Sequence, residues 1–132
     1  MKIVNENDLP EKQVPGRTIR WLYEKGGPVE AEFLSFCVIN ITPGSTVTPA
    51  HSHPDGEELV YIMSGNGHVY IDGEIRPMEA GCAILFEKGS KHMLRNSGDV
   101  PMKVACFYAP ATNMSEYSFH PEVDFDNGRM DE

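Results

Sequence analysis

The chain has 132 residues, 40% of them hydrophobic, and a formal net charge of −9 at neutral pH. This length suits one domain, and the hydrophobic content is enough for a buried core, which excludes wholesale disorder. The negative charge argues against nucleic acid and against an anionic membrane surface as partners, because proteins bind both through basic surfaces.

Three cysteines, Cys37, Cys82 and Cys106, lie in apolar runs without a paired spacing. The odd count predicts reduced thiols rather than a disulfide scaffold. The first residues show no signal-peptide pattern, and no apolar run approaches the roughly 20 residues that a membrane helix needs. We therefore expect a cytoplasmic protein without a membrane segment.

Residues 1–16 are polar and end in Pro15-Gly16, which predicts a short N-terminal arm leading into the domain. The domain itself is expected over residues 17–110. There, short apolar runs alternate with turn residues, and no segment shows a convincing helical period with caps. The runs that predict strands are 18–23, 31–41, 59–63, 68–71, 75–78, 83–86, 92–95 and 102–108.

Turn residues divide these strands. The sequence Ser-Gly-Asn-Gly at 64–67 predicts a tight hairpin, and Asp72-Gly73 predicts a second one. Pro77 indicates an edge strand or a strand end, because proline cannot donate to a sheet ladder. Short strands at this regular spacing are typical of an all-β sandwich or barrel.

Residues 111–132 form an acidic C-terminal tail in which Arg129 is the one arginine or lysine. The aromatic side chains around Tyr117 and Phe119 predict that the first part of the tail packs on the barrel. The last part, 126–132, is expected to be mobile, as chain ends often are.

The residues that carry chemistry begin at His51 and His53. Alternate residues of a strand share a face, so two imidazoles at this spacing can clamp one metal ion. Pro54 and Gly56 allow a turn that returns the carboxylate of Glu58 to the same centre. Glu58 opens an apolar strand, where an unpaired carboxylate is costly to bury, and a metal ion would offset that cost.

A third imidazole is available at His92, which follows the turn residues 87–90. Three neutral imidazoles and one carboxylate suit one divalent transition metal ion, namely iron, manganese, nickel, copper or zinc. They would leave one or two coordination positions open, as a catalytic site requires. Taken alone, each histidine could instead have a structural role.

The spacing of these residues resembles the two motifs of the cupin superfamily. The first motif consists of a glycine, His-x-His, a glutamate and a second glycine, which here are Gly44, His51, His53, Glu58 and Gly65. The gap before His51 is one residue longer than usual and falls in a loop, where insertions are tolerated. The six-residue gap from Glu58 to Gly65 favours Glu58 over its neighbour Glu57 as the ligand.

The second cupin motif has the form Gly, Pro-x-Gly, His, Asn, which here reads Gly81, Glu87, Gly89, His92 and Asn96. Only the proline is replaced, by Glu87, and this change does not affect a ligand. The resemblance also suggests a structural rather than a catalytic role for Asn96. It covers residues 18–108, most of the chain.

The resemblance implies a cupin-type jelly-roll barrel whose metal ligands are His51, His53, Glu58 and His92. It also implies a homodimer, since similar cupins commonly pair barrel to barrel. The leading functional hypothesis is a metal-dependent enzyme of the dioxygenase, lyase, decarboxylase or isomerase type, acting on a small polar or anionic organic molecule. The alternative is a non-catalytic cupin that binds or senses a sugar or an organic acid. No general base can be named from the sequence.

Overall fold

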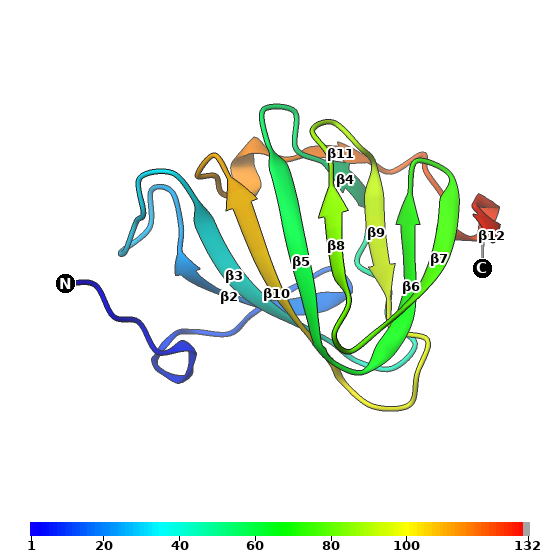
Figure 1. Cartoon of the computed structure of the whole chain (residues 1–132), viewed down its shortest axis with the longest axis horizontal. Coiled ribbons are helices and arrows are strands. Elements are labelled where there is room, and N and C mark those ends of the chain that lie inside the picture. Colours follow the sequence, from blue (N-terminus) through cyan, green and yellow to red (C-terminus); the bar gives the residue numbers. More distant parts are fainter. Residues whose placement is uncertain (131–132) are drawn as a thin grey trace.

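The computed structural model describes residues 1–130, which fold into two facing six-stranded sheets (Figure 1). The first sheet has the order β1 (Lys12–Val14), β2 (Arg17–Tyr23), β3 (Ser35–Ile41), β10 (Met102–Ala109), β5 (Glu57–Ser64), β8 (Ala83–Phe86). The second sheet has the order β11 (Ser118–His120), β4 (Ala50–Ser52), β9 (His92–Arg95), β6 (Asn66–Ile71), β7 (Glu74–Glu79), β12 (Arg129–Met130). Three short 3-10 helices complete this part of the chain, η1 (Glu6–Asp8), η2 (Met114–Glu116) and η3 (Phe125–Asn127).

The predicted all-β architecture of two packed sheets is confirmed. Along β5, Val60 and Ile62 are buried while Leu59, Tyr61 and Met63 are exposed, as expected for a strand with one face on the core. The main core fills the space between the sheets and includes Ile39 from β3 and Val104 from β10. None of the helices within residues 1–130 is long and apolar enough to cross a membrane.

Most predicted strands coincide with observed ones. The strands expected at 83–86 and 92–95 are β8 and β9, and the Asp72-Gly73 hairpin joins β6 to β7 with Ile71 opposite Glu74. Both turn residues have positive φ, 46° at Asp72 and 92° at Gly73, as a two-residue hairpin of this type requires. Pro77 lies on β7, whose outer neighbour β12 pairs only with Glu74 and Ile75, so no ladder bond is lost there.

The predicted hairpin at 64–67 is wrong. β5 and β6 lie in different sheets, because both edges of β5 are already paired, with β10 and with β8. The chain crosses between the sheets at Gly65, and Gly67 then passes close to β9, where an added Cβ would lie 1.9 Å from the Arg95 carbonyl oxygen. These glycines therefore permit close backbone approach rather than a hairpin. The strand expected at 31–41 is also shorter, since β3 begins only at Ser35.

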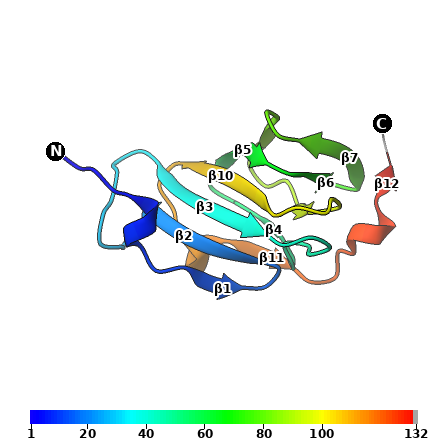
Figure 2. The same cartoon turned by 90° about the horizontal axis from the view of Figure 1, so that it is seen from below.

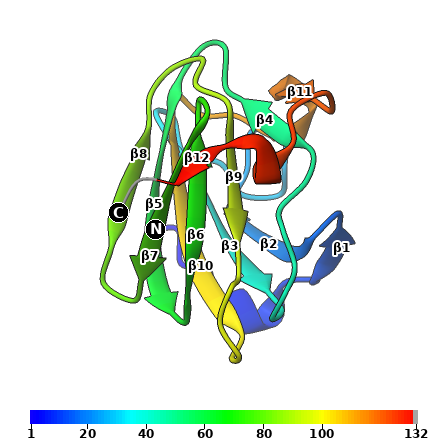
Figure 3. The ribbon, with the colours of Figure 1, turned by 90° about the vertical axis from the view of Figure 1, so that its right-hand side faces the viewer.

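The C-terminal segment runs along the second sheet from β11 to β12 (Figure 3). β11 pairs with β4, and Tyr117 is buried, so the first part of the tail lies against the second sheet. Phe125 lies on the outer face of this sheet with Ala50, Tyr70 and Met93. Residues 126–130, for which we expect mobility, include the end of η3 and the strand β12, which pairs with β7. Residues 131–132 lie outside the described part of the chain.

The outer face of the first sheet differs from that of the second sheet, because six large apolar side chains lie on it and the chain covers them little. This apolar face consists of Phe36, Leu59, Tyr61, Met63, Leu85 and Phe107. Five of them, all but Phe36, are 40–48% exposed. The N-terminal segment lies at the border of this face and the C-terminal segment at the opposite end of the molecule (Figures 1 and 2).

Candidate metal centre

Four buried polar side chains meet between the two sheets. His51 lies on β4 and faces His92 on β9 across an antiparallel pair, His53 follows β4, and Glu58 lies near the start of β5. One nitrogen or oxygen from each of these four residues lies within 4.8 Å of the others. All four are at most 7% exposed, so the cluster is enclosed by the barrel. The structure thus brings together all four of the ligands expected from the sequence.

Glu58 is at the middle of this cluster. Its Oε1 lies 2.9 Å from His53 Nε2 and 3.1 Å from His92 Nε2. Burial raises the pKa of the Glu58 carboxyl, but hydrogen bonds from His53 and His92 outweigh that effect and hold its pKa well below the ordinary value. The carboxylate is therefore ionised in the folded protein.

Backbone carbonyls orient two of the imidazoles. His92 Nδ1 lies 3.1 Å from the Ser90 oxygen, and His51 Nδ1 lies 3.4 Å from the Pro49 oxygen. A carbonyl only accepts, so each Nδ1 carries its proton and, in a neutral ring, leaves the Nε2 lone pair facing the cluster. Burial, followed by the charge of His92, lowers the pKa of His51, which keeps this ring neutral. The hydrogen bonds to Glu58 put a proton between each of the His53 and His92 Nε2 atoms and the carboxylate. A metal ion bound to the neutral imidazoles would take the place of these protons, so this donor set fits a metal ion.

The choice between the two adjacent glutamates follows from strand geometry. Glu57 is exposed and Glu58 is 4% exposed, because neighbouring strand residues point to opposite faces. The expectation of a structural role for Asn96 is confirmed. Its Nδ2 donates to the carbonyl oxygens of Ile41 and Val100, 2.8 Å away in each case, and its Oδ1 accepts from the Gly98 amide.

Aromatic rings surround the imidazoles. Phe86 stacks on His92 with a centroid distance of 3.8 Å, and Tyr117 stacks on His51 at 5.3 Å. Tyr108 meets His53 edge to face at 5.2 Å. Burial is the largest cause that raises the pKa values of Tyr108 and Tyr117, and both hydroxyls keep their protons. These rings exclude water and limit the rotation of the imidazoles.

Sequence reasoning did not place three of the residues near the cluster. Tyr108 lies opposite Glu58 in the β10–β5 register, so strand parity could have located it once that pairing was known. Tyr117 was expected to pack on the barrel but not on His51. Arg17, at the first position of β2, shares a cavity with His51 and Glu58, and no sequence motif indicated it.

The other two histidines lie outside the cluster. His68 Nδ1 lies 2.8 Å from Ser97 Oγ, and His120 Nε2 lies 2.8 Å from Ser52 Oγ. Cys37 and Cys106 are buried free thiols and Cys82 is a partly exposed one, in agreement with the prediction of reduced cysteines.

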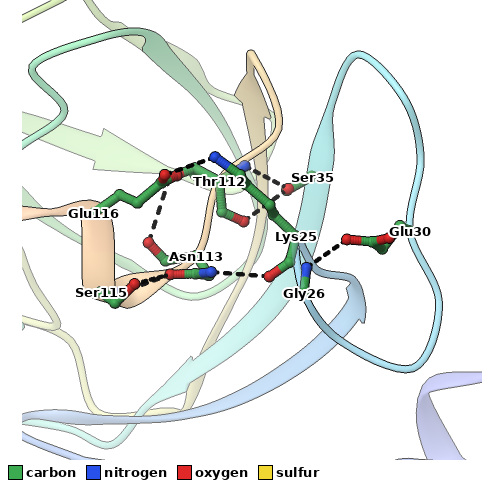
Figure 4. A network of polar contacts seen from close by, with 8 residues as sticks. All are labelled: Lys25, Gly26, Glu30, Ser35, Thr112, Asn113, Ser115 and Glu116. Atoms are coloured by element: carbon green, nitrogen blue, oxygen red, sulfur yellow. Dashed lines mark hydrogen bonds and ion pairs between the residues drawn. The ribbon is translucent and has the colours of Figure 1, made fainter.

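A cavity of about 110 Å³ connects His53 and Tyr108 with the protein surface. Its rim includes Lys25 and Glu116, whose Nζ and Oε2 atoms are 2.6 Å apart. Figure 4 shows the polar network behind this pair, in which Thr112 donates to Glu116 and exchanges hydrogen bonds with Ser35. The network joins the loop after β2 to the segment that carries Tyr117, so it fixes the shape of the cavity mouth.

Comparisons with known proteins agree with this geometry. Residues 37–108, more than half of the chain, match the family model described as the cupin domain. Protein SchB of Streptomyces halstedii is 29% identical over 110 residues, covering 83% of this chain and 78% of that protein. The tetracenomycin polyketide synthase protein TcmJ of Streptomyces glaucescens is 28% identical over 109 residues, covering 83% and 71%.

Among solved structures, that of a protein described as a predicted oxalate decarboxylase from Thermotoga maritima superposes with a TM-score of 0.73. Its sequence identity is 20%, and the match covers 83% of this chain and 99% of that one. At this identity the likeness concerns the fold alone.

Proposed function

The chain belongs to the cupin family, and we propose that it is a metal-dependent enzyme acting on a small polar or anionic organic molecule. The metal would be held by His51, His53, Glu58 and His92. The observation that carries this proposal is the convergence of four donor atoms within 4.8 Å, from both sheets, in a buried site. A purely structural cluster has no need of three imidazoles directed at one carboxylate.

Three imidazoles and one carboxylate suit iron, manganese, nickel, copper or zinc. When bound, such an ion supplies Lewis acidity to a substrate oxygen or a site for dioxygen. The side chains of the protein supply charge, hold the imidazoles and shape the entrance. Glu58 supplies negative charge to the centre, Tyr108 and Tyr117 hold the imidazoles and exclude water, and Lys25 stands at the cavity mouth where an anionic ligand would enter.

The reaction is a proposal at the level of class: dioxygenase, lyase, decarboxylase or isomerase. The relative named for polyketide synthesis supports catalysis on small organic molecules over mere binding. The alternative, a module that binds or senses a sugar or organic acid, shares the same barrel and differs in having no need of an open metal position.

Elemental analysis of the purified protein tests the metal site. We expect one transition metal ion per chain in the wild type, and at least a tenfold weaker affinity in Glu58→Gln, which loses the central charge. Glu57→Gln is the matched control, because its exposed side chain points away from the cluster. Equal metal content in the two variants would contradict the assignment of Glu58.

Removal of the metal separates an enzyme from a binding module. In an enzyme of the proposed kind, turnover of the substrate stops in metal-free protein and returns when the ion is restored. A metal-free protein that still binds the same molecule, with no turnover in either state, would favour the module instead.

We also propose a homodimer formed through the apolar face of the first sheet. The support is that five large apolar side chains of this face are 40–48% exposed in one contiguous patch, which is typical of a protein–protein contact. The free thiols of Cys37 and Cys106 support a reducing, cytoplasmic location.

A further inference from the structure

Arg17 is the one lysine or arginine of residues 1–130 that is buried, with 6% of its surface exposed. A guanidinium group remains charged at any pH that the protein tolerates, so its burial needs compensation. In the described part of the chain, no carboxylate lies within 4.0 Å of it. Its one side-chain hydrogen bond runs from Nη1 to the Pro15 carbonyl oxygen, at 3.0 Å. A buried charge with so little local compensation needs an explanation.

The backbone holds Arg17 in this position. The β1–β2 connection at Pro15-Gly16 places Arg17 opposite Val14, and Gly16 has a φ of 78°. An added Cβ at Gly16 would lie 1.8 Å from the Thr46 carbonyl oxygen, so the turn is packed directly against the loop before β4. Strand alternation then turns Arg17 inward with Ile19. The arginine is therefore built into the barrel interior and does not depend on a flexible loop.

Inside the barrel, Arg17 faces the metal centre. A small cavity of about 20 Å³ is lined by Arg17 together with His51, Glu58 and His92. The remaining wall is apolar apart from Cys106 and Tyr108.

The charges in this cavity favour an anion. Glu58 is the one carboxylate that lines it, and its Oε1 already contacts His53 and His92. A divalent ion at the centre would neutralise Glu58 and leave Arg17 in a region of excess positive charge. The planar guanidinium matches a carboxylate, which can accept two parallel hydrogen bonds.

We propose that Arg17 forms an anion subsite that binds a carboxylate group of the molecule held at the metal centre. The identity of that molecule as a ligand of the metal rests on the proposed function. The cavity of about 20 Å³ is too small for a ring or a branched chain.

Titration with formate, followed by NMR of the arginine Nε–Hε groups, tests this subsite directly. In metal-free wild-type protein, the Arg17 resonance shifts on addition of formate and does not shift with formamide, which has a similar size and no charge. The affinity for formate falls about tenfold or more in Arg17→Gln, whereas Arg17→Lys retains part of it. Arg20→Gln is the matched control, because Arg20 lies on the same strand and pairs instead with Glu11 at 3.2 Å.

Repeating the titration with zinc-loaded protein separates the proposal of an anion subsite at Arg17 from the proposal of a metal-dependent function. A bound ion adds positive charge beside Arg17, so formate binds more tightly to the loaded protein. If the protein takes up no metal but formate still shifts Arg17, the proposed function fails and the anion subsite stands. If formate leaves the Arg17 resonance unchanged in both states, or binds equally to Arg17→Gln and the wild type, the subsite is refuted. The wild-type resonance gives this answer even if Arg17→Gln fails to fold.

Discussion

The two sheets of this barrel share one core but differ on their outer faces. The outer face of the second sheet is covered by the chain itself, where Phe125 packs on Tyr70 and Met93. The outer face of the first sheet keeps Tyr61, Phe107 and their neighbours 40–48% exposed. Both faces are apolar, so the hydrophobic effect acts on both.

The comparison shows that a sheet face can be covered from within the chain or left for a partner. The C-terminal segment covers the second sheet from within the chain, with Phe125 as its anchor. Arg95 on β9 packs over this anchor, since its guanidinium carbon lies 4.0 Å from the Phe125 ring centroid. Nothing in residues 1–130 supplies an equivalent cover for the first sheet. A second copy of the chain would supply it, which is the basis of the dimer proposal.

The largest effect is expected from Phe125→Ala, which removes the anchor of the covered face. Phe125 is 6% exposed, and truncation of a buried phenylalanine lowers the free energy of unfolding by about 3 kcal/mol. Urea unfolding measures this loss. Phe119→Ala is the control, since Phe119 lies on the same segment, is 45% exposed and should cost well under half as much. Equal losses would show that Phe125 is not the anchor.

Metal binding should stabilise the contact between the sheets without involving either outer face. The proposed ligands come from both sheets, so an ion at a concentration 100 times its dissociation constant adds about 2.7 kcal/mol to the free energy of unfolding. Thermal unfolding with and without zinc measures the gain. With an at least tenfold weaker affinity, the gain should fall to about 1.4 kcal/mol or less in Glu58→Gln. It should persist in Glu57→Gln and Phe125→Ala. A gain in Glu58→Gln as large as in the wild type would place the ion elsewhere.

A smaller loss is expected from Arg95→Met. Arg95 covers the Phe125 ring, pairs with Asp126 at 2.8 Å and donates to Thr46 Oγ1. Loss of these partly exposed contacts lowers the free energy of unfolding by about 1 kcal/mol. Asp126→Asn removes the exposed ion pair alone and should change the stability by less than about 0.5 kcal/mol. If Asp126→Asn cost as much as Arg95→Met, the ion pair rather than the ring contact would hold the tail.

The smallest change in the stability of the folded chain is expected from Phe107→Glu on the uncovered face. Phe107 is 40% exposed, so a single charge there changes the free energy of unfolding of the monomer by about 0.5 kcal/mol or less. Its effect on assembly should be large, because a buried carboxylate would oppose pairing of two apolar faces. Light scattering should find a dimer for the wild type and a monomer for Phe107→Glu. Phe125→Ala should remain dimeric, and a monomeric wild type would refute this use of the face.

The sequence predicted the parts of the structure that depend on local pattern. Period-two alternation and turn residues located β8 and β9, and the cupin spacing identified the four residues that meet in the site. Glu58 was separated from Glu57 by motif spacing, and burial of Glu58 agrees with that choice.

The parts that escaped prediction depend on which strands become neighbours. The glycines at 65 and 67 have the composition of a hairpin turn, and only the occupied edges of β5 show that the chain must cross to the other sheet. Tyr117 reaches His51 because β11 pairs with β4, far away in sequence. The sequence does not distinguish Arg17 from an ordinary surface arginine, since strand parity does not tell which face of a strand becomes the interior.

The position of β10 has a consequence for the synthesis of the chain. β10 lies between β3 and β5 and pairs with both, although it is the last barrel strand of the first sheet to leave the ribosome. Until Met102–Ala109 has emerged, β3 and β5 each lack the partner on one side, and folding of this sheet must wait for a contact that is distant in sequence. A nascent chain that stalls before Met102 therefore displays two unpaired strand edges, which makes aggregation the first hazard of incomplete translation.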